Sequence, residues 1–161
     1  MTMQEMHDLE DELRSIYTDE DSLLNATINT VMRTLGVSAK HLGYQYIFLA
    51  ARYIRTQPPE LSKETKKGLY PYLESVVHSP IPMIQRTMHY AICYAWNRAD
   101  PKVLYSYLGL RGKNLKEPPG NIEYVYLIAE RVRLIIGDQK WEDYYQKIKK
   151  ELLEKYHWLD D

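Results

Sequence analysis

Cysteine, phenylalanine and long apolar runs are all scarce in this chain of 161 residues. Cys93 is the single cysteine, which excludes an internal disulfide and is consistent with a reducing cytoplasm. No apolar run approaches the roughly 18 residues that a membrane-spanning helix needs. The N-terminus is acidic rather than basic and then apolar, so we expect no secretory signal peptide. These absences predict a cytoplasmic protein without a membrane segment.

Sequence signatures of catalysis and of metal binding are missing as well. The five histidines form no H-x-x-x-H pair and no Cys/His cluster, which argues against a metal site. Cys93 has no nearby sequence partner of the kind that activates a nucleophile, so we interpret it as a packed or half-exposed thiol. There is no phosphate-cradling glycine loop and no nucleophile elbow. We therefore expect no enzyme, no catalytic residue, no metal and no cofactor.

Apolar residues recur at helical spacing along most of the chain, which predicts an all-α, multi-helix domain. The segment 39–55 is apolar on most sides and should lie at the centre of the core. Gly36 and Gly137 fit positions just after helices, and Ser38, Asp100 and Asn121 fit positions just before them. We expect helices at about 4–16, 21–35, 39–55, 69–77, 80–98, 101–108, 121–136 and 139–158.

The net charge of −1 conceals three segments of different sign. Residues 1–24 carry eight Asp and Glu against one Arg, so we interpret them as an acidic N-terminal arm or helix. Residues 25–137 carry fifteen Lys and Arg against seven Asp and Glu, a surplus of +8 that suits binding to phosphates. Residues 138–161 are predicted to form a helical extension, which we expect to pack on the domain. The alternative is that this extension forms a dimer contact.

Residues 69–98 have the pattern of a helix-turn-helix, with a short helix, the turn His78-Ser79-Pro80 and a longer second helix. Ser79 should cap the second helix, and Pro80 should occupy its first position. Apolar residues at helical spacing in the second helix predict one buried stripe, formed by Ile84, Met88, Ala91, Ile92 and Ala95.

The opposite face of that helix carries Pro82, Gln85, Arg86 and His89. Gln and Arg are side chains that pair with adenine and guanine in the DNA major groove, so this face is a candidate base-reading surface. The alternative is a core helix whose polar face is merely solvated.

From Ile28 to Leu134 the chain resembles the C-terminal effector domain of the sporulation response regulator family, stage-zero sporulation protein A. The resemblance rests on short pieces that keep their order and spacing over about two thirds of the chain. These pieces are Gly36-Val37 with Ala39, Gly43-Tyr44 with Tyr46, Leu69-Tyr70-Pro71, Arg86, Ala91-Ile92, Ala95-Trp96, Pro119 with Asn121, Glu123 and Tyr124, and Ala129 before Arg133-Leu134.

The resemblance implies an all-helical DNA-binding domain of a bacterial transcription regulator, with Pro80–Arg98 as its recognition helix and promoter DNA as its partner. Base contacts would come from Met83, Gln85, Arg86 and His89. Backbone contacts would come from Ser79, from Lys63, Lys66 and Lys67, and from the loop cations Arg111, Lys113 and Lys116; for the three lysines ahead of Gly68, a solvated connector is the alternative. A homodimer on DNA and a protein partner for the acidic arm both stay open.

This sequence departs from the family in two respects. Relatives carry a receiver domain ahead of the matching region, whereas too few residues precede it here, so the chain is either a fragment or a protein without phosphorylation control. The family's recognition helix begins with small hydroxyl residues and bears a further Arg and a Glu, whereas this chain has Pro82, Met83 and Gln85 there. We therefore expect altered DNA specificity; the alternative is a helical protein-interaction module that has kept the fold.

Overall fold

A computed structural model describes residues 2–5, 20–55, 57, 63–109 and 116–137, with single residues at 143, 146 and 150. Within these residues the secondary structure is helical and no strand occurs, so the predicted all-α class is confirmed. The helices are α2 (Glu20–Thr34), α3 (Leu42–Arg55), α4 (Lys63–Val77), α5 (Ile81–Arg98), α6 (Pro101–Tyr107) and α7 (Asn121–Ile136).

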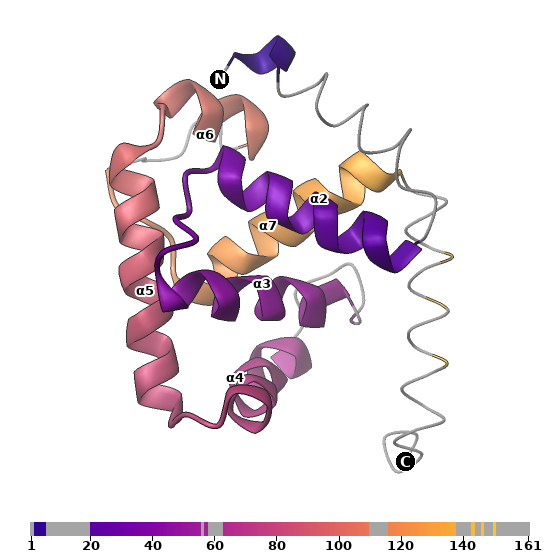
Figure 1. Cartoon of the computed structure of the whole chain (residues 1–161), viewed down its shortest axis with the longest axis vertical. Helices are drawn as coiled ribbons and strands as arrows, with labels where there is room; N and C mark the ends of the chain where they lie inside the picture. The colour runs from indigo at the N-terminus through magenta and orange to yellow at the C-terminus, as the bar shows by residue number, and fades with distance from the viewer. Residues whose placement is uncertain are drawn as a thin grey trace.

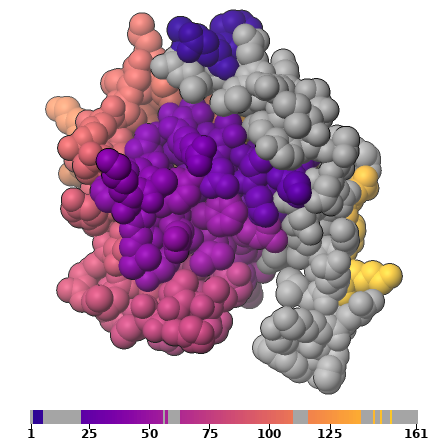
Figure 2. All heavy atoms as spheres, in the orientation of Figure 1, coloured from indigo at the N-terminus to yellow at the C-terminus, as the bar shows by residue number. Residues whose placement is uncertain are grey.

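Helix α3 lies at the centre of the arrangement, as its apolar sequence predicted. It contacts α2, α4, α5 and α7 (Figure 1). Tyr46, Ile47, Ala50 and Ile54 of α3 are buried in one continuous core that also takes in the apolar stripes of the surrounding helices. Leu42 is an exception, because this predicted core residue stands 56% exposed at the first position of the helix. In the same orientation, Figure 2 shows α2 and α3 on the near face, with α4 and α5 along its border.

A glycine allows α3 and α5 to cross at short range. A Cβ atom added to Gly43 would lie 2.5 Å from the Thr87 carbonyl oxygen and 2.8 Å from the Ala91 Cβ, both on α5. Real Cβ atoms essentially never come that close to other atoms, so only glycine fits this position. The position of α5 against the core therefore depends on a residue without a side chain.

The first helix of the expected helix-turn-helix is longer than the sequence suggested. Helix α4 begins at Lys63 rather than near Leu69 and runs without a break through Gly68 and Pro71. Thr65, Leu69 and Leu73 of α4 are all buried, and their spacing of four residues forms a stripe that holds the helix on the core. Tertiary packing thus outweighs the low helix propensity of Gly and Pro.

Several helix ends differ from the expected capping. Pro80, not Ser79, is the N-cap of α5, and no side chain caps that end. Gly120 is the N-cap of α7, so Asn121 is its first helical residue instead of its cap. Helix α3 begins at Leu42, because Ser38 accepts the backbone N–H of Lys40 within a turn that precedes the helix.

Other helix ends follow the sequence prediction. The Asp100 side chain accepts the N–H of Lys102 at the start of α6. Gly36 and Gly137 adopt positive φ values of 83° and 97° after α2 and α7, where a residue with a side chain would be strained.

The border between the acidic arm and the domain falls within a helix. Leu23 and Leu24, which the charge count assigned to residues 1–24, are buried core residues of α2. Met3 is partly buried and packs against the same core. Most of the predicted helix at 139–158 and most of the one at 4–16 lie outside the described residues.

Candidate nucleic-acid interface

Helix α5 has the two faces that its sequence predicted. Its apolar stripe is fully buried and consists of Ile84, Met88, Ala91, Ile92 and Ala95, each 0% exposed. Its opposite side is open to solvent, and all four side chains predicted to contact bases are exposed there: Met83, Gln85, Arg86 and His89. The structure therefore leaves these side chains accessible to a groove of DNA.

Within the part of the chain that the structure describes, the side-chain contact of Arg86 is a weak one. One of its guanidinium nitrogens (Nη2) lies 3.3 Å from the sulfur of Met83, three residues earlier on α5. A thioether is a poor hydrogen-bond acceptor, so a base edge with two good acceptors can replace it at little cost. Met83 thus holds the Arg86 side chain along the exposed face of the helix.

Most of the residues predicted to contact the DNA backbone belong to the described part of the chain. Lys63, Lys66 and Lys67 are exposed on the first two turns of α4, so the alternative of a connector outside a helix does not hold. Ser79 is half-buried in the turn, and Lys116 is exposed ahead of α7. Arg111 and Lys113 lie outside the described residues.

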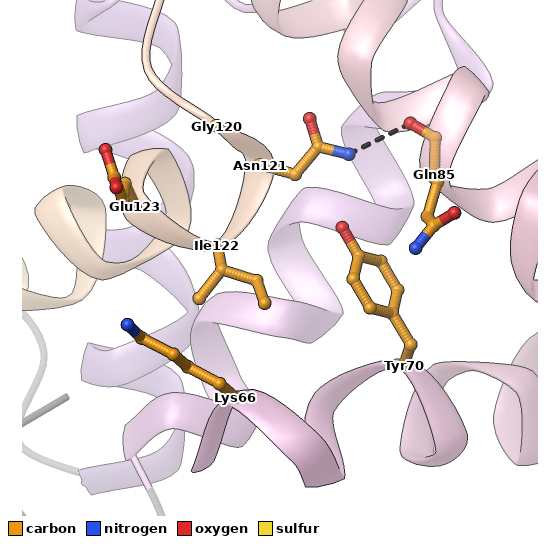
Figure 3. A pocket seen from close by; sticks show the side chains of 7 residues that line it. All are labelled: Lys66, Tyr70, Gln85, Gly120, Asn121, Ile122 and Glu123. Atoms are coloured by element: carbon orange, nitrogen blue, oxygen red, sulfur yellow. Dashed lines mark hydrogen bonds between the residues drawn. The ribbon is translucent and has the colours of Figure 1, made fainter. Parts of the chain in front are cut away.

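A contact that the sequence did not reveal joins α7 to the exposed face of α5. The Asn121 side chain donates a hydrogen bond from Nδ2 to the backbone carbonyl of Gln85 at 2.9 Å (Figure 3). The hydroxyl of Tyr70 on α4 points toward the same place. Burial raises the pKa of Tyr70, and a hydrogen bond with the Asn121 side chain partly offsets that rise. Helices α4, α5 and α7 thus meet at one residue of the candidate reading face.

The meeting point borders an open hollow of about 420 Å³. Its lining comes from α4, α5 and the start of α7: Lys66, Tyr70, Gln85, Gly120, Asn121, Ile122 and Glu123. Lys66 is the one predicted backbone contact that the described residues bring to this junction.

Cys93 is a half-buried thiol, as the sequence predicted, but it has a neighbour that the sequence analysis missed. Its sulfur lies 3.3 Å from Nε2 of His89, one helical turn earlier on the exposed side of α5. The spacing of four residues within a predicted helix was the available signal, because such residues are neighbours on a helix surface. No group of three or more His, Cys, Asp or Glu side chains that could hold a metal ion occurs in the part of the chain that the structure describes.

In the described ranges, none of the helices combines the length and the apolar character needed to cross a membrane. Residues 28–132 match the family described as "Sporulation initiation factor Spo0A C terminal". The matched range covers well over half of the chain, and it includes the turn between α4 and α5 as well as the contact between Gln85 and Asn121.

Proposed function

The chain belongs to the family of the sporulation initiation factor Spo0A C-terminal domain, a family of DNA-binding effector domains, and from this premise we propose that it is a transcription regulator that reads promoter DNA with α5. In this proposal α4 and α5 act as a helix-turn-helix, with α5 in the major groove and its N-terminal half at the base edges. The protein acts in the bacterial cytoplasm, at the nucleoid.

The observation that supports this proposal most directly is the exposed side of α5. Gln85, Arg86 and His89 project from one solvent-facing side, whereas the other side of the same helix is buried completely. Because the guanidinium of Arg86 bonds a thioether, which is a poor acceptor, it can turn to the O6 and N7 atoms of a guanine. Gln85 and His89 then lie one residue before it and three residues after it, within reach of neighbouring base pairs.

Charge supports DNA as the partner. Residues 25–137 carry a surplus of +8, and the exposed lysines Lys63, Lys66 and Lys67 gather on the first turns of α4. Cations near the reading helix would position it by contacts to phosphates, which carry no sequence information. Lys116, and Arg111 and Lys113 in the same segment of the chain, are proposed for the same role.

We propose that the preferred DNA sequence differs from that of typical family members. Pro82 and Met83 stand where the family carries a hydroxyl residue and an Arg, and Met83 is 50% exposed, so that an apolar side chain replaces a base-reading cation. Loss of one bidentate contact removes about 1–3 kcal/mol of discrimination at one base pair. The specificity of this chain should therefore rest mainly on Arg86 and its neighbours.

A second candidate function is a protein-interaction module that uses the same helix. Met83 and Tyr90 are 50% and 63% exposed on α5, and aromatic and methionine side chains are enriched at protein interfaces. In that case the acidic N-terminal arm could provide a further contact to the partner.

Selection of binding sites from random duplexes, with the full chain at one fixed salt concentration, tests the main proposal. We expect a defined preferred site, in which paired half-sites would indicate a homodimer. On that site, Arg86→Ala should cost about 1–3 kcal/mol and relax the preference at one base pair. Lys66→Ala should instead weaken binding to all sequences alike and lower the salt slope by about one unit.

Arg98→Ala is the matched control for Arg86→Ala. Arg98 lies on the same helix and carries the same charge, but its guanidinium lies over the Tyr94 ring at 3.5 Å, near the C-terminal end of α5. It should leave the base preference unchanged. If selection returns no preferred site, or if Arg86→Ala and Arg98→Ala have equal effects on preference, direct readout by α5 is refuted. The interaction module would then be the better account, and an Arg86→Ala chain should still capture its protein partner.

A further inference from the structure

The exposed side of α5 contains a second hollow, of about 480 Å³, next to Arg86. Five of its lining residues lie within nine consecutive positions of α5, and the sixth is the first residue of α7. The lining consists of Gln85, Arg86, His89, Tyr90, Cys93 and Asn121. Positions 85 and 93 are eight residues apart, which corresponds to about 12 Å along a helix.

The wall of this hollow is almost entirely apolar, although most of its residues are polar by type. The polar atoms of these residues are partly occupied by one another. The Asn121 amide donates to the Gln85 carbonyl at 2.9 Å, and the His89 ring nitrogen lies 3.3 Å from the Cys93 sulfur. An apolar group that enters the hollow would therefore meet little polar surface.

The inference rests on the proposed function, in which this side of α5 enters the major groove. The edges of base pairs in that groove are polar except for one group, the C5-methyl of thymine. Arg86 lines the hollow together with His89, Tyr90 and Cys93, so a guanine read by Arg86 would bring a neighbouring base pair next to the apolar wall. We propose that the hollow receives the methyl group of a thymine next to that guanine, and that Cys93, His89 and Tyr90 determine specificity for it.

Replacement of thymine by deoxyuridine tests this, because the exchange removes one methyl group and leaves every hydrogen-bonding group in place. The full chain is titrated with its selected duplex and with a series in which each thymine in turn is deoxyuridine. We expect about a fourfold loss of affinity at the one or two positions beside the guanine, which is what burial of one methyl-sized group provides. The other positions should change less than twofold.

A substitution that fills the hollow tests whether the loss of affinity with deoxyuridine depends on the residues that line it. Cys93 is half-buried, so Cys93→Ile places a bulky side chain in the hollow without disturbing the core. The difference in affinity between the thymine duplex and the deoxyuridine duplex should then disappear. Asn97→Ile is the matched control, since Asn97 is exposed one turn further along α5 and does not line the hollow. It should preserve the fourfold difference.

The outcomes separate this inference from the proposed function. A preferred duplex that tolerates every deoxyuridine refutes the methyl site and leaves DNA reading intact. A thymine effect that persists in Cys93→Ile also refutes it, because the methyl group would then be bound elsewhere. Absence of any preferred duplex refutes both together.

Discussion

The crossing of α3 and α5 at Gly43 allows a sharp test of how the reading helix is held. Gly43→Ala would place a Cβ atom 2.5 Å from the Thr87 carbonyl oxygen, nearly 1 Å inside ordinary contact, which begins at 3.4 Å. The same atom would lie 2.8 Å from the Ala91 Cβ. Both neighbours belong to, or are attached directly to, the backbone of α5, so neither can rotate away. The two helices would have to separate.

The expected cost follows from two opposing terms. Alanine favours a helix interior over glycine by about 0.8–1.0 kcal/mol. Overpacking of a well-packed core costs about 1–3 kcal/mol, and the upper end applies where rigid backbone must move. The net loss of unfolding free energy should therefore be about 2 kcal/mol. A shift of α5 away from α3 should also weaken binding to the preferred DNA site.

Gly68→Ala is the matched control for this variant. Gly68 also lies inside a helix, but the added Cβ would meet mainly the hydroxyl end of the Tyr53 side chain, which can move aside. Here the helix propensity term should dominate, so that stability stays equal or rises by up to about 1 kcal/mol. Urea unfolding of the two variants measures the difference. Equal stabilities for Gly43→Ala and Gly68→Ala would refute the close-crossing argument.

Three further predictions concern a core ring, a turn and the acidic arm. Trp96 is 5% exposed and lies edge-to-face on Tyr124, so Trp96→Ala should cost about 3–5 kcal/mol in urea unfolding; a loss below about 1 kcal/mol would contradict its structural role. His78 adopts a φ of 56° between α4 and α5, so His78→Gly should raise the unfolding free energy by about 1 kcal/mol, whereas a comparable gain from His78→Ala would disprove strain as the cause. Replacement of the four acidic residues within 8–12 by their amides should strengthen DNA binding by the full chain, because an acidic arm screens the basic domain from DNA. The gain in affinity should be larger at low salt than at high salt. Unchanged affinity at both salt concentrations would argue against screening by the arm.

Periodicity alone predicted much of this molecule. The helical spacing of Ile84, Met88 and Ala95 located the buried stripe of α5, because residues three or four apart share a helix face wherever that helix packs. The same reasoning predicted that Arg86 and Gln85 lie on the opposite, solvent-exposed face. Helix ends were less predictable: Ser79 and Asn121 are both good capping residues by type, yet neither caps its helix in the structure.

Tertiary packing decided what local sequence could not. The sequence analysis began this helix only after Gly68, but α4 starts at Lys63 and continues through Gly68 because Thr65, Leu69 and Leu73 are buried on one side of it. The low helix propensity of a single Gly costs about 1 kcal/mol relative to Ala. Burial of the whole stripe stabilises the helix through several side chains together.

The composition of the candidate site shows the same division. The sequence by itself determined which α5 side chains face solvent, since that follows from a local period of 3.6 residues. It could not place Asn121 against Gln85, because 36 positions separate them and only the packing of α7 beside α5 joins them. The two hollows that border this contact exist for the same reason: each requires walls from helices that only the folded core brings together.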